Sequence, residues 1–275
     1  MSIKIMVSGL PGNMASVFYR HAILEEEFEV LPFSITGPMI TSKELAINGN
    51  KIKLIRVTET KKKNDIIKKF KPFIAIDYTL PNAVDDNIKF YCKNDISFVM
   101  GTTGVNIKRA AKLIENSNIN AVIAPNMGKQ IVALQAMLEY LAVTFPNCFS
   151  GFKLEIIESH QFGKTDTSGT ALSMLNIFER LGAKLEGSIE KIRDPKIQLE
   201  MGIPENVLGG HGWHTYKLSY GKDKNVAINL EHNINGRDIY ARGTIDSIKF
   251  LNKMNSQGNS GCLYNMIDVL KDLKL

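Results

Sequence analysis

Cysteine, tryptophan and long apolar runs are scarce in this sequence. It has 275 residues but only one tryptophan and three cysteines, Cys92, Cys148 and Cys262. Three widely spaced cysteines fit neither a disulfide framework nor a zinc site, and they are typical of a protein in a reducing compartment. The longest apolar runs, such as 131–134 and 73–76, are far shorter than the ~20 residues that a membrane-spanning helix needs. We therefore expect no membrane association.

The sequence also shows no targeting pattern. An apolar run typical of a first strand begins at Ile3, so we expect no signal or transit peptide before it. Together with the unpaired cysteines, this predicts a cytoplasmic protein.

The charge is mildly positive, and no acidic excess offsets it. The net charge is +6, and lysines gather at positions 61–63 and 68–71. Such a cluster fits either a nucleic-acid patch or the solvated face of an amphipathic helix. We favour the helix, because the lysines flank Ile66, Ile67 and Phe70 at helical spacing. We expect no nucleic-acid partner, and a field that attracts anionic substrates and phosphate-bearing cofactors.

Short apolar runs alternate with helical patterns in the first 127 residues. We expect strands at 3–8, 28–35, 73–78, 97–100 and 121–124, and helices at 14–25, 65–70, 82–93 and 107–116. The second strand contains Pro32, which indicates an edge or a kink. Repeated units of this kind build a doubly wound parallel sheet.

The pattern changes after an expected helix at 128–144. Strand-like alternation at 152–158, 213–219, 226–232 and 240–246 is typical of a sheet with one open face, and a helix is expected at 170–181. Residues 191–212 look irregular, and 246–253 and 261–272 look helical. The sequence predicts an α/β chain in which 1–127 and 238–275 form a dinucleotide-binding domain. Residues 128–237 then form an α+β domain with an open mixed sheet.

A glycine-rich turn follows the first expected strand. It fits the pattern G-x-x-G-x-x-A and consists of Gly9, Leu10, Pro11, Gly12, Asn13, Met14 and Ala15. Glycines let the backbone approach a pyrophosphate, and the helix that follows offers free N–H groups and a positive dipole end. A plain tight turn is the alternative, but the position in the first β-α unit favours a dinucleotide site.

Further turns end other parallel strands, where ligands bind in doubly wound sheets. We expect cofactor contacts from Thr79, from Gly101, Thr102 and Thr103, and from Ala124, Pro125, Asn126 and Met127. For any one of these turns alone, an ordinary polar turn fits equally well.

The end of the second expected strand lacks the acidic residue that usually binds a ribose 2′-hydroxyl. The residues there are Ser34, Ile35, Thr36 and Gly37. Without a carboxylate nothing repels a 2′-phosphate, although no arginine stands there to bind one. We expect Ser34 to contact the cofactor, and NADPH to be preferred over NADH.

The segment 158–171 carries residues suited to proton transfer and to anion binding. His160 and Lys164 lie in a loop, and Ser168, Gly169 and Thr170 begin a helix whose N–H groups and hydroxyls suit a carboxylate. A reductase needs a proton donor beside its substrate, because hydride adds to one atom and a proton to another. The alternative is a capped helix with solvated side chains.

This segment resembles the dihydrodipicolinate reductase signature, roughly E-x-H-H/Q-x-x-K-x-D-(x)-S-G-T-A. The turns at 9–14, 77–81, 101–104 and 125–127, and Gly236-Arg237, follow in family order, so the resemblance covers nearly the whole chain. The phrases at 127–130, 192–195 and 203–205 make it similar to the plant-type branch.

The resemblance implies a Rossmann-like nucleotide domain and a C-terminal substrate domain that joins subunits into a dimer or tetramer. It implies NAD(P)H-dependent reduction of 4-hydroxy-tetrahydrodipicolinate, a small dicarboxylate, in the diaminopimelate route to lysine. His160 matches the acid/base position and Lys164 the proton donor. The substrate-binding positions are Thr103, Gln161, Ser168, Gly169, Thr170 and Arg237.

The chain departs from the family pattern at three positions. Gln161 stands where many members have a second histidine, no proline precedes Ser168, and Ala15 replaces a third glycine. Gln161 can form hydrogen bonds but cannot titrate.

Other readings stay open. His211 and His214 lack further ligands at matching spacing, so we expect packing there and no metal. An aspartate-semialdehyde or homoserine type of dehydrogenase would share the nucleotide domain, and the former needs a nucleophilic cysteine such as Cys148. A dinucleotide-sensing regulator would have lost the cluster at His160 and Lys164, which is intact.

Overall fold

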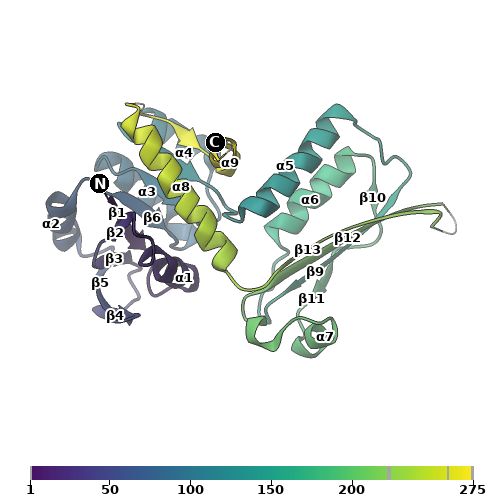
Figure 1. The fold of residues 1–275 in the computed structure, drawn as a ribbon, viewed down its shortest axis with the longest axis horizontal. Helices are drawn as coiled ribbons and strands as arrows, with labels where there is room; N and C mark the ends of the chain where they lie inside the picture. Colours follow the sequence, from purple (N-terminus) through teal and green to yellow (C-terminus); the bar gives the residue numbers. More distant parts are fainter. Residues whose placement is uncertain (1, 222–223, 259, 274–275) are drawn as a thin grey trace. The chain divides into compact units, whose positions relative to one another are not determined.

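A computed structural model describes residues 2–221, 224–258 and 260–273, which divide into two compact units (Figure 1). Unit 1 consists of Met1–Lys129 and Asp238–Leu275, and unit 2 of Gln130–Arg237. The divisions predicted from the sequence lie after residues 127 and 237.

Unit 1 contains a six-stranded parallel sheet. Its order is β14 (Leu263–Tyr264), β8 (Ala121–Ile123), β7 (Phe98–Met100), β6 (Ile74–Asp77), β1 (Ile3–Ser8) and β2 (Phe28–Val30). From β1 the chain first builds β2 on one side and later β6 on the other. Ligands bind at such a switch point, beyond the carboxyl ends of the strands. The predicted Rossmann-like sheet is confirmed.

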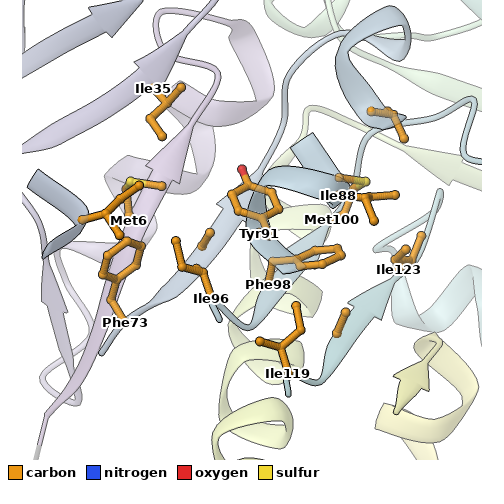
Figure 2. Packing of buried hydrophobic residues seen from close by; sticks show 14 of the residues in the cluster. Met6, Ile35, Phe73, Ile88, Tyr91, Ile96, Phe98, Met100, Ile119 and Ile123 are labelled. Carbon is orange, nitrogen blue, oxygen red and sulfur yellow. The ribbon is translucent and has the colours of Figure 1, made fainter. Parts of the chain in front are cut away.

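The core of unit 1 explains why these strands form. Every residue of β6, β7 and β8 is buried, as in a sheet covered on both faces. Figure 2 shows Met6, Phe73, Tyr91, Phe98 and Ile123 in this core. The covering helices are α1 (Asn13–Ala22), which packs against α8 (Asp238–Ser256), and α3 (Val84–Lys93), which packs against α4 (Ile107–Glu115).

The single strand predicted at 28–35 is two strands. After β2, β3 (Phe33–Thr36) joins a separate sheet with β5 (Asn50–Arg56) and β4 (Glu44–Ile47), neither of which the sequence analysis expected. Leu31 still donates its N–H to Ile5 of β1, but Pro32 has no N–H, and its carbonyl accepts from Lys53 of β5. The proline therefore marks the change of sheet.

The lysine-rich segment folds as the predicted amphipathic helix. It is α2 (Thr60–Phe70), which buries Ile67 and leaves most of its lysines exposed. The helix begins five residues earlier than the 65–70 expected.

Unit 2 is built around β9 (Lys153–His160). This strand pairs antiparallel with β12 (Gly212–Tyr220) and parallel with β10 (Lys184–Leu185) and β11 (Glu190–Ile192). Beyond β12 lies β13 (Val226–Ile234). The helices α5 (Lys129–Thr144) and α6 (Gly169–Arg180) lie along one face of the sheet (Figure 1). The predicted open mixed sheet is confirmed.

Two predictions about the second half were wrong. Residues 240–246, predicted as a strand, belong to α8, which buries Ala241, Thr244, Ile245 and Ile248 at helical spacing. Gly243 lies against the backbone of Met127, and a Cβ there would stand 1.8 Å from the Met127 carbonyl oxygen.

The segment 191–212, predicted as irregular, contains the end of β11, the helix α7 (Pro195–Glu200) and the 3-10 turn η2 (Glu205–Val207). The chain ends with β14 and α9 (Met266–Asp272). Among the residues that the structure describes, no helix is long and apolar enough to cross a membrane.

Candidate active site

The glycine turn between β1 and α1 has the geometry of an anion site. Gly9 has φ of +103°, and a Cβ there would stand 2.3 Å from the Tyr78 carbonyl oxygen. Gly12 caps α1 without any side-chain hydrogen bond. The first N–H groups of α1 therefore stay available to a phosphate group at the positive end of the helix dipole.

Ser34 holds this turn from behind and does not face outward. Its buried hydroxyl accepts a hydrogen bond from Leu10 N at 3.3 Å, and Thr36 Oγ1 donates to Leu10 O at 2.6 Å. Both backbone groups of Leu10 are thus engaged, and its side chain is buried. The structure therefore places Ser34 and Leu10 as supports of the turn.

Asp77, at the end of β6, is a fully buried carboxylate that joins two of the expected cofactor turns. Its Oδ1 accepts from Thr79 N at 3.0 Å, Thr79 Oγ1 at 2.7 Å and Thr102 Oγ1 at 3.1 Å. Its Oδ2 accepts from Asn87 Nδ2 at 2.9 Å and Tyr91 OH at 2.8 Å. Burial, with the negative charge of Asp77, raises the pKa of Tyr91 well above its ordinary value. The hydroxyls of Thr79 and Thr102 are therefore occupied by hydrogen bonds to the Asp77 carboxylate.

The turn after β8 is fixed from within unit 1. Asn126 Oδ1 accepts from Gly128 N at 2.8 Å, and α8 packs backbone to backbone on Met127 at Gly243. Of the expected cofactor residues, Pro11, Gly12, Asn13, Thr103 and Pro125 are exposed, Met14, Thr79, Gly101 and Asn126 are partly exposed, and Thr102, Ala124 and Met127 are buried.

In unit 2, the sheet face beneath α5 and α6 changes from apolar to titratable along its length. The apolar end carries Leu154, Ile156, Tyr216 and Leu218. At the other end the register pairs His214 with Glu158 on one side and with His232 on the other. With His160, these side chains form a polar cluster, which we call the histidine face: Glu158, His160, His214 and His232.

The imidazoles of this face are neutral at ordinary pH. Burial lowers the pKa of His160 to about 4; Glu158 opposes the shift, and Arg193 and Lys164 add to it. Burial, with the neighbouring His232 and His160, lowers the pKa of His214 to about 2. His160 Nδ1 lies 3.2 Å from the His211 carbonyl oxygen, which fixes the proton there, and the buried Nε2 has no partner among the described residues. His160 thus presents an unused lone pair.

Lys164 projects from a short loop between β9 and α6. The loop turns at Gly163, whose φ is +91°, and Lys164 N donates to Gln161 O at 3.1 Å. The Lys164 ammonium bonds Asp166 Oδ2 at 2.6 Å, and this contact lowers the pKa of the Asp166 carboxyl. Asp166 is three-quarters exposed, so a substrate carboxylate can take its place.

Helix α6 begins beside this loop, and Ser168 is occupied by structural bonds. Its hydroxyl accepts from Thr170 N at 3.2 Å and lies 3.1 Å from His214 Nε2, while its own N–H donates to Glu158 Oε2 at 2.9 Å. Gly169 is exposed and Thr170 partly exposed. The Gly169 N–H and the Thr170 hydroxyl, rather than Ser168 or the Thr170 N–H, are therefore the groups at this helix start that an anion can bind.

Arg237 lies at the end of unit 2 against a glycine. Its Nη2 donates to Gly209 O at 3.2 Å, and a Cβ on Gly210 would stand 2.7 Å from its Nη1. The remaining guanidinium donors can bind a carboxylate in bidentate fashion. Gln161 is partly exposed in the loop before Lys164.

The histidine face also has the composition of a metal site, but its carboxylate is already used. Glu158, His160 and His214 offer ligand atoms within 4.8 Å of one another. Both oxygens of Glu158 are engaged, Oε1 by Arg193 and Oε2 by Ser168 N. In this group of ligand atoms, the two imidazoles of His160 and His214 fall short of the three or four ligands typical of zinc.

Sequence reasoning missed four residues of these two groups: Asp77, Glu158, Arg193 and His214. Gln198, fully buried, also belongs here, because its Nε2 donates to His160 O at 2.7 Å. The signal for Glu158 was present, since it lies two residues from His160 on the same strand face. Arg193 gave no local signal.

Two family models match this chain. The family model described as "Dihydrodipicolinate reductase, N-terminus" matches residues 3–127, and that for the C-terminus matches 130–270. A chloroplastic 4-hydroxy-tetrahydrodipicolinate reductase 2 of Arabidopsis thaliana is 40% identical over 273 residues, which cover 98% of this chain and 78% of that protein. The enzyme of Methanothermobacter thermautotrophicus is 26% identical over 98% of both chains.

A solved structure shares the fold. The dipicolinate-bound dihydrodipicolinate reductase from Paenisporosarcina sp. TG-14 superposes with a TM-score of 0.67 at 19% identity, over 96% of this chain and 98% of that one. The higher identity to the plant protein confirms the predicted plant-type resemblance. Because both family models match and the plant relative is 40% identical over nearly the whole chain, this protein belongs to the dihydrodipicolinate reductase family.

Proposed function

We propose that this chain catalyses the NAD(P)H-dependent reduction of 4-hydroxy-tetrahydrodipicolinate to tetrahydrodipicolinate, with loss of water, in the diaminopimelate route to lysine. The observation that carries the proposal is the gathering of His160, Lys164 and the start of α6 at the polar end of one sheet face. This set offers a cation, an imidazole and free helix N–H groups, which suit a dicarboxylate that must also receive a proton.

The nucleotide end of the chain suits a pyridine dinucleotide. The uncapped start of α1 and the glycines at 9 and 12 fit a pyrophosphate, and we assign the adjoining contacts to Thr79, to 101–103 and to 124–127. When bound, the nicotinamide supplies the hydride. We assign Ser34 and Asp77 to the support of these turns, because their polar atoms are engaged inside the protein.

We assign the chemistry of the substrate end to two side chains. Lys164 donates the proton that accompanies the hydride, and His160 accepts or returns a proton through its unused Nε2. Gly169, Thr170 and Arg237 hold the carboxylates, with Gln161 and Thr103 as further contacts. The reaction then adds one hydride and one proton to the heterocycle and releases one water.

We infer that NADPH is preferred over NADH, and Arg56 supports this. The register places Arg56, at the end of β5, beside Thr36, at the end of β3. Strand β3 is the one whose end lacks the usual acidic residue, so a guanidinium near it favours a 2′-phosphate. The side chain is 45% exposed and therefore accessible.

The proposal is tested by steady-state kinetics with freshly generated heterocycle and each nicotinamide in turn. We expect NADPH to be oxidised with a higher kcat/KM than NADH. Arg56→Ala should raise the KM for NADPH about tenfold, because it removes one bidentate contact to the 2′-phosphate. The KM for NADH should not change. Turnover of aspartate semialdehyde alone would instead favour the dehydrogenase alternative with Cys148. Dinucleotide binding without turnover of either substrate would favour the regulator.

We also propose that the protein is a homo-oligomer. Met137, Tyr140 and Val143 project from α5 and are 58%, 69% and 68% exposed, an apolar row that favours burial against another chain. Light scattering after gel filtration measures the mass, and a monomer at micromolar concentration would contradict this.

We further propose a cytoplasmic location, which the three free cysteines favour. The plant relatives are named chloroplastic. Cell fractionation distinguishes the two locations.

A further inference from the structure

We propose that the buried Glu158 and the partly buried Arg193 form an ion pair whose task is to position the Lys164 loop, residues 161–168, and that neither contacts the substrate. The inference rests on the proposed function of Lys164. It adds two positioning residues to that site, one of which lies outside the signature segment.

Arg193 has no donor left for a ligand. A guanidinium has five N–H donors. In Arg193, Nε donates to Lys164 O at 2.8 Å. Nη1 donates to Ile192 O at 3.0 Å and to Glu158 O at 3.4 Å. Nη2 donates to Asp166 O at 3.4 Å and to the Glu158 carboxylate. Two of the five acceptors are carbonyls of the loop itself. Arg193 therefore fixes the backbone on both sides of Thr165.

Glu158 fixes the far end of the same loop. It is fully buried, with Oε1 bound by Arg193 and Oε2 accepting the N–H of Ser168 at 2.9 Å. Ser168 is the N-cap of α6, so one carboxylate joins β9 and the start of α6. A buried carboxylate is tolerated only with a paired cation, and removing either partner leaves an uncompensated charge.

Besides these bonds, the loop accepts a hydrogen bond at Thr165 O from Nζ of the exposed Lys191, at 3.3 Å. The loop's one large apolar side chain, Phe162, is 76% exposed, and Thr165 and Asp166 are exposed as well. Gly163 adds backbone freedom rather than order. The guanidinium bonds are consequently the main restraint on the position of Lys164.

Misplacing a catalytic group by about 1 Å costs about 10²-fold in rate. We therefore expect Arg193→Gln to lower kcat about 10²-fold. The binding of NADPH should be unchanged, because every acceptor of Arg193 lies between residues 158 and 192. Amide hydrogen exchange of 161–168 should be faster in this variant.

Three further variants complete the test. Arg193→Lys keeps the charge but has three donors instead of five, and it should recover part of kcat. Glu158→Gln should speed exchange at both 161–168 and the first turn of α6. The double variant should be no slower than the slower single variant, because the pair acts as one unit.

Arg180→Gln is the matched control, since Arg180 forms an exposed ion pair with Glu139 at 2.6 Å in the same unit. It should leave kcat and loop exchange at wild-type values.

The inference is wrong if Arg193→Gln keeps the wild-type kcat and loop exchange. It is also wrong if only the KM for the dicarboxylate rises while kcat and exchange stay constant, because Arg193 would then bind substrate. If Arg193→Gln fails to fold, Arg193→Lys decides: full kcat and unchanged exchange would contradict the positioning role. If the wild type reduces no heterocycle, the proposed function fails, and the exchange data alone still decide whether the pair orders the loop.

Discussion

Lys164 is the residue to which we assign the proton transfer of the proposed reaction. Its ammonium is paired with the exposed Asp166 at 2.6 Å. We predict that Lys164→Ala lowers kcat by about 10²–10⁴-fold, the usual contribution of a positioned acid, measured as NADPH oxidation. Lys153→Ala, which breaks a surface pair with Glu186 at the start of β9, is the control. Near-normal turnover would remove Lys164 from the mechanism.

His160 should take up a proton when a dicarboxylate binds. Its pKa is lowered to about 4 by burial, so it is neutral in the free protein near pH 7. Two carboxylates brought nearby raise that pKa, so between the free and the bound pKa values a proton enters with the ligand. We predict that affinity for dipicolinate rises as the pH falls through this interval.

Calorimetry in buffers of different ionisation enthalpy measures the proton uptake, which His160→Gln should abolish. His21→Gln is the control, because His21 pairs with Asp238 in unit 1. Equal uptake by wild type and His160→Gln would assign the proton to another group.

At the scale of single residues, the sequence predicted the site residues within the segment 158–171 but not the residues that hold them in place. His160, Lys164 and the start of α6 lie within eleven residues of one another, so their spacing could be read. Arg193 lies far along the chain, and its pairing with Glu158 depends on β11 returning beside β9. A buried charge also looks like any surface charge in a sequence. Ser34 and Ser168 were assigned to ligands for the same reason, although both are engaged internally.

Among the elements, the end of β6 organises the nucleotide end of unit 1. Asp77 receives five hydrogen bonds from four residues on three separate segments. We predict that Asp77→Ala lowers the free energy of unfolding by at least about 3 kcal/mol, since several buried donors lose their acceptor. Urea denaturation measures this loss.

Asp77→Asn keeps one acceptor oxygen and should cost less, while raising the KM for NADPH because the turns at Thr79 and Thr102 shift. Asp86→Ala is the control, since Asp86 is exposed and forms only a surface pair with Lys89. Equal stability of Asp77→Ala and Asp86→Ala would contradict the supporting role.

The sequence predicted best those elements whose residue pattern directly reflects their burial. β6, β7 and β8 are apolar throughout because helices cover both faces. The prediction failed at 240–246, where the helix α8 meets a backbone at Gly243, a contact that no local periodicity encodes. It failed again at β4 and β5, an antiparallel pair that β3 joins after Pro32 through pairing distant in sequence.

At the scale of the whole molecule, the chain leaves unit 1 at Lys129, builds unit 2, and returns at Asp238. The candidate nucleotide contacts at 9–14 and 124–127 belong to unit 1, and the candidate substrate contacts at 160–170 belong to unit 2. Each ligand should therefore order its own segments. We predict that NADPH slows amide exchange at 9–14 and 101–103, and that dipicolinate slows it at 161–170.

The same assignment has a thermodynamic consequence. A ligand that binds only the native state at about 100 times its Kd adds about 2.7 kcal/mol to its stability. NADPH and dipicolinate should each raise the unfolding temperature. Arg237→Ala should reduce the shift due to dipicolinate and not that due to NADPH, whereas a loss of both shifts would mean that Arg237 supports the fold rather than the dicarboxylate. Protection by NADPH confined to 161–170 would contradict the assignment of the dinucleotide to unit 1, and with it the reading of the glycine turn as a phosphate site.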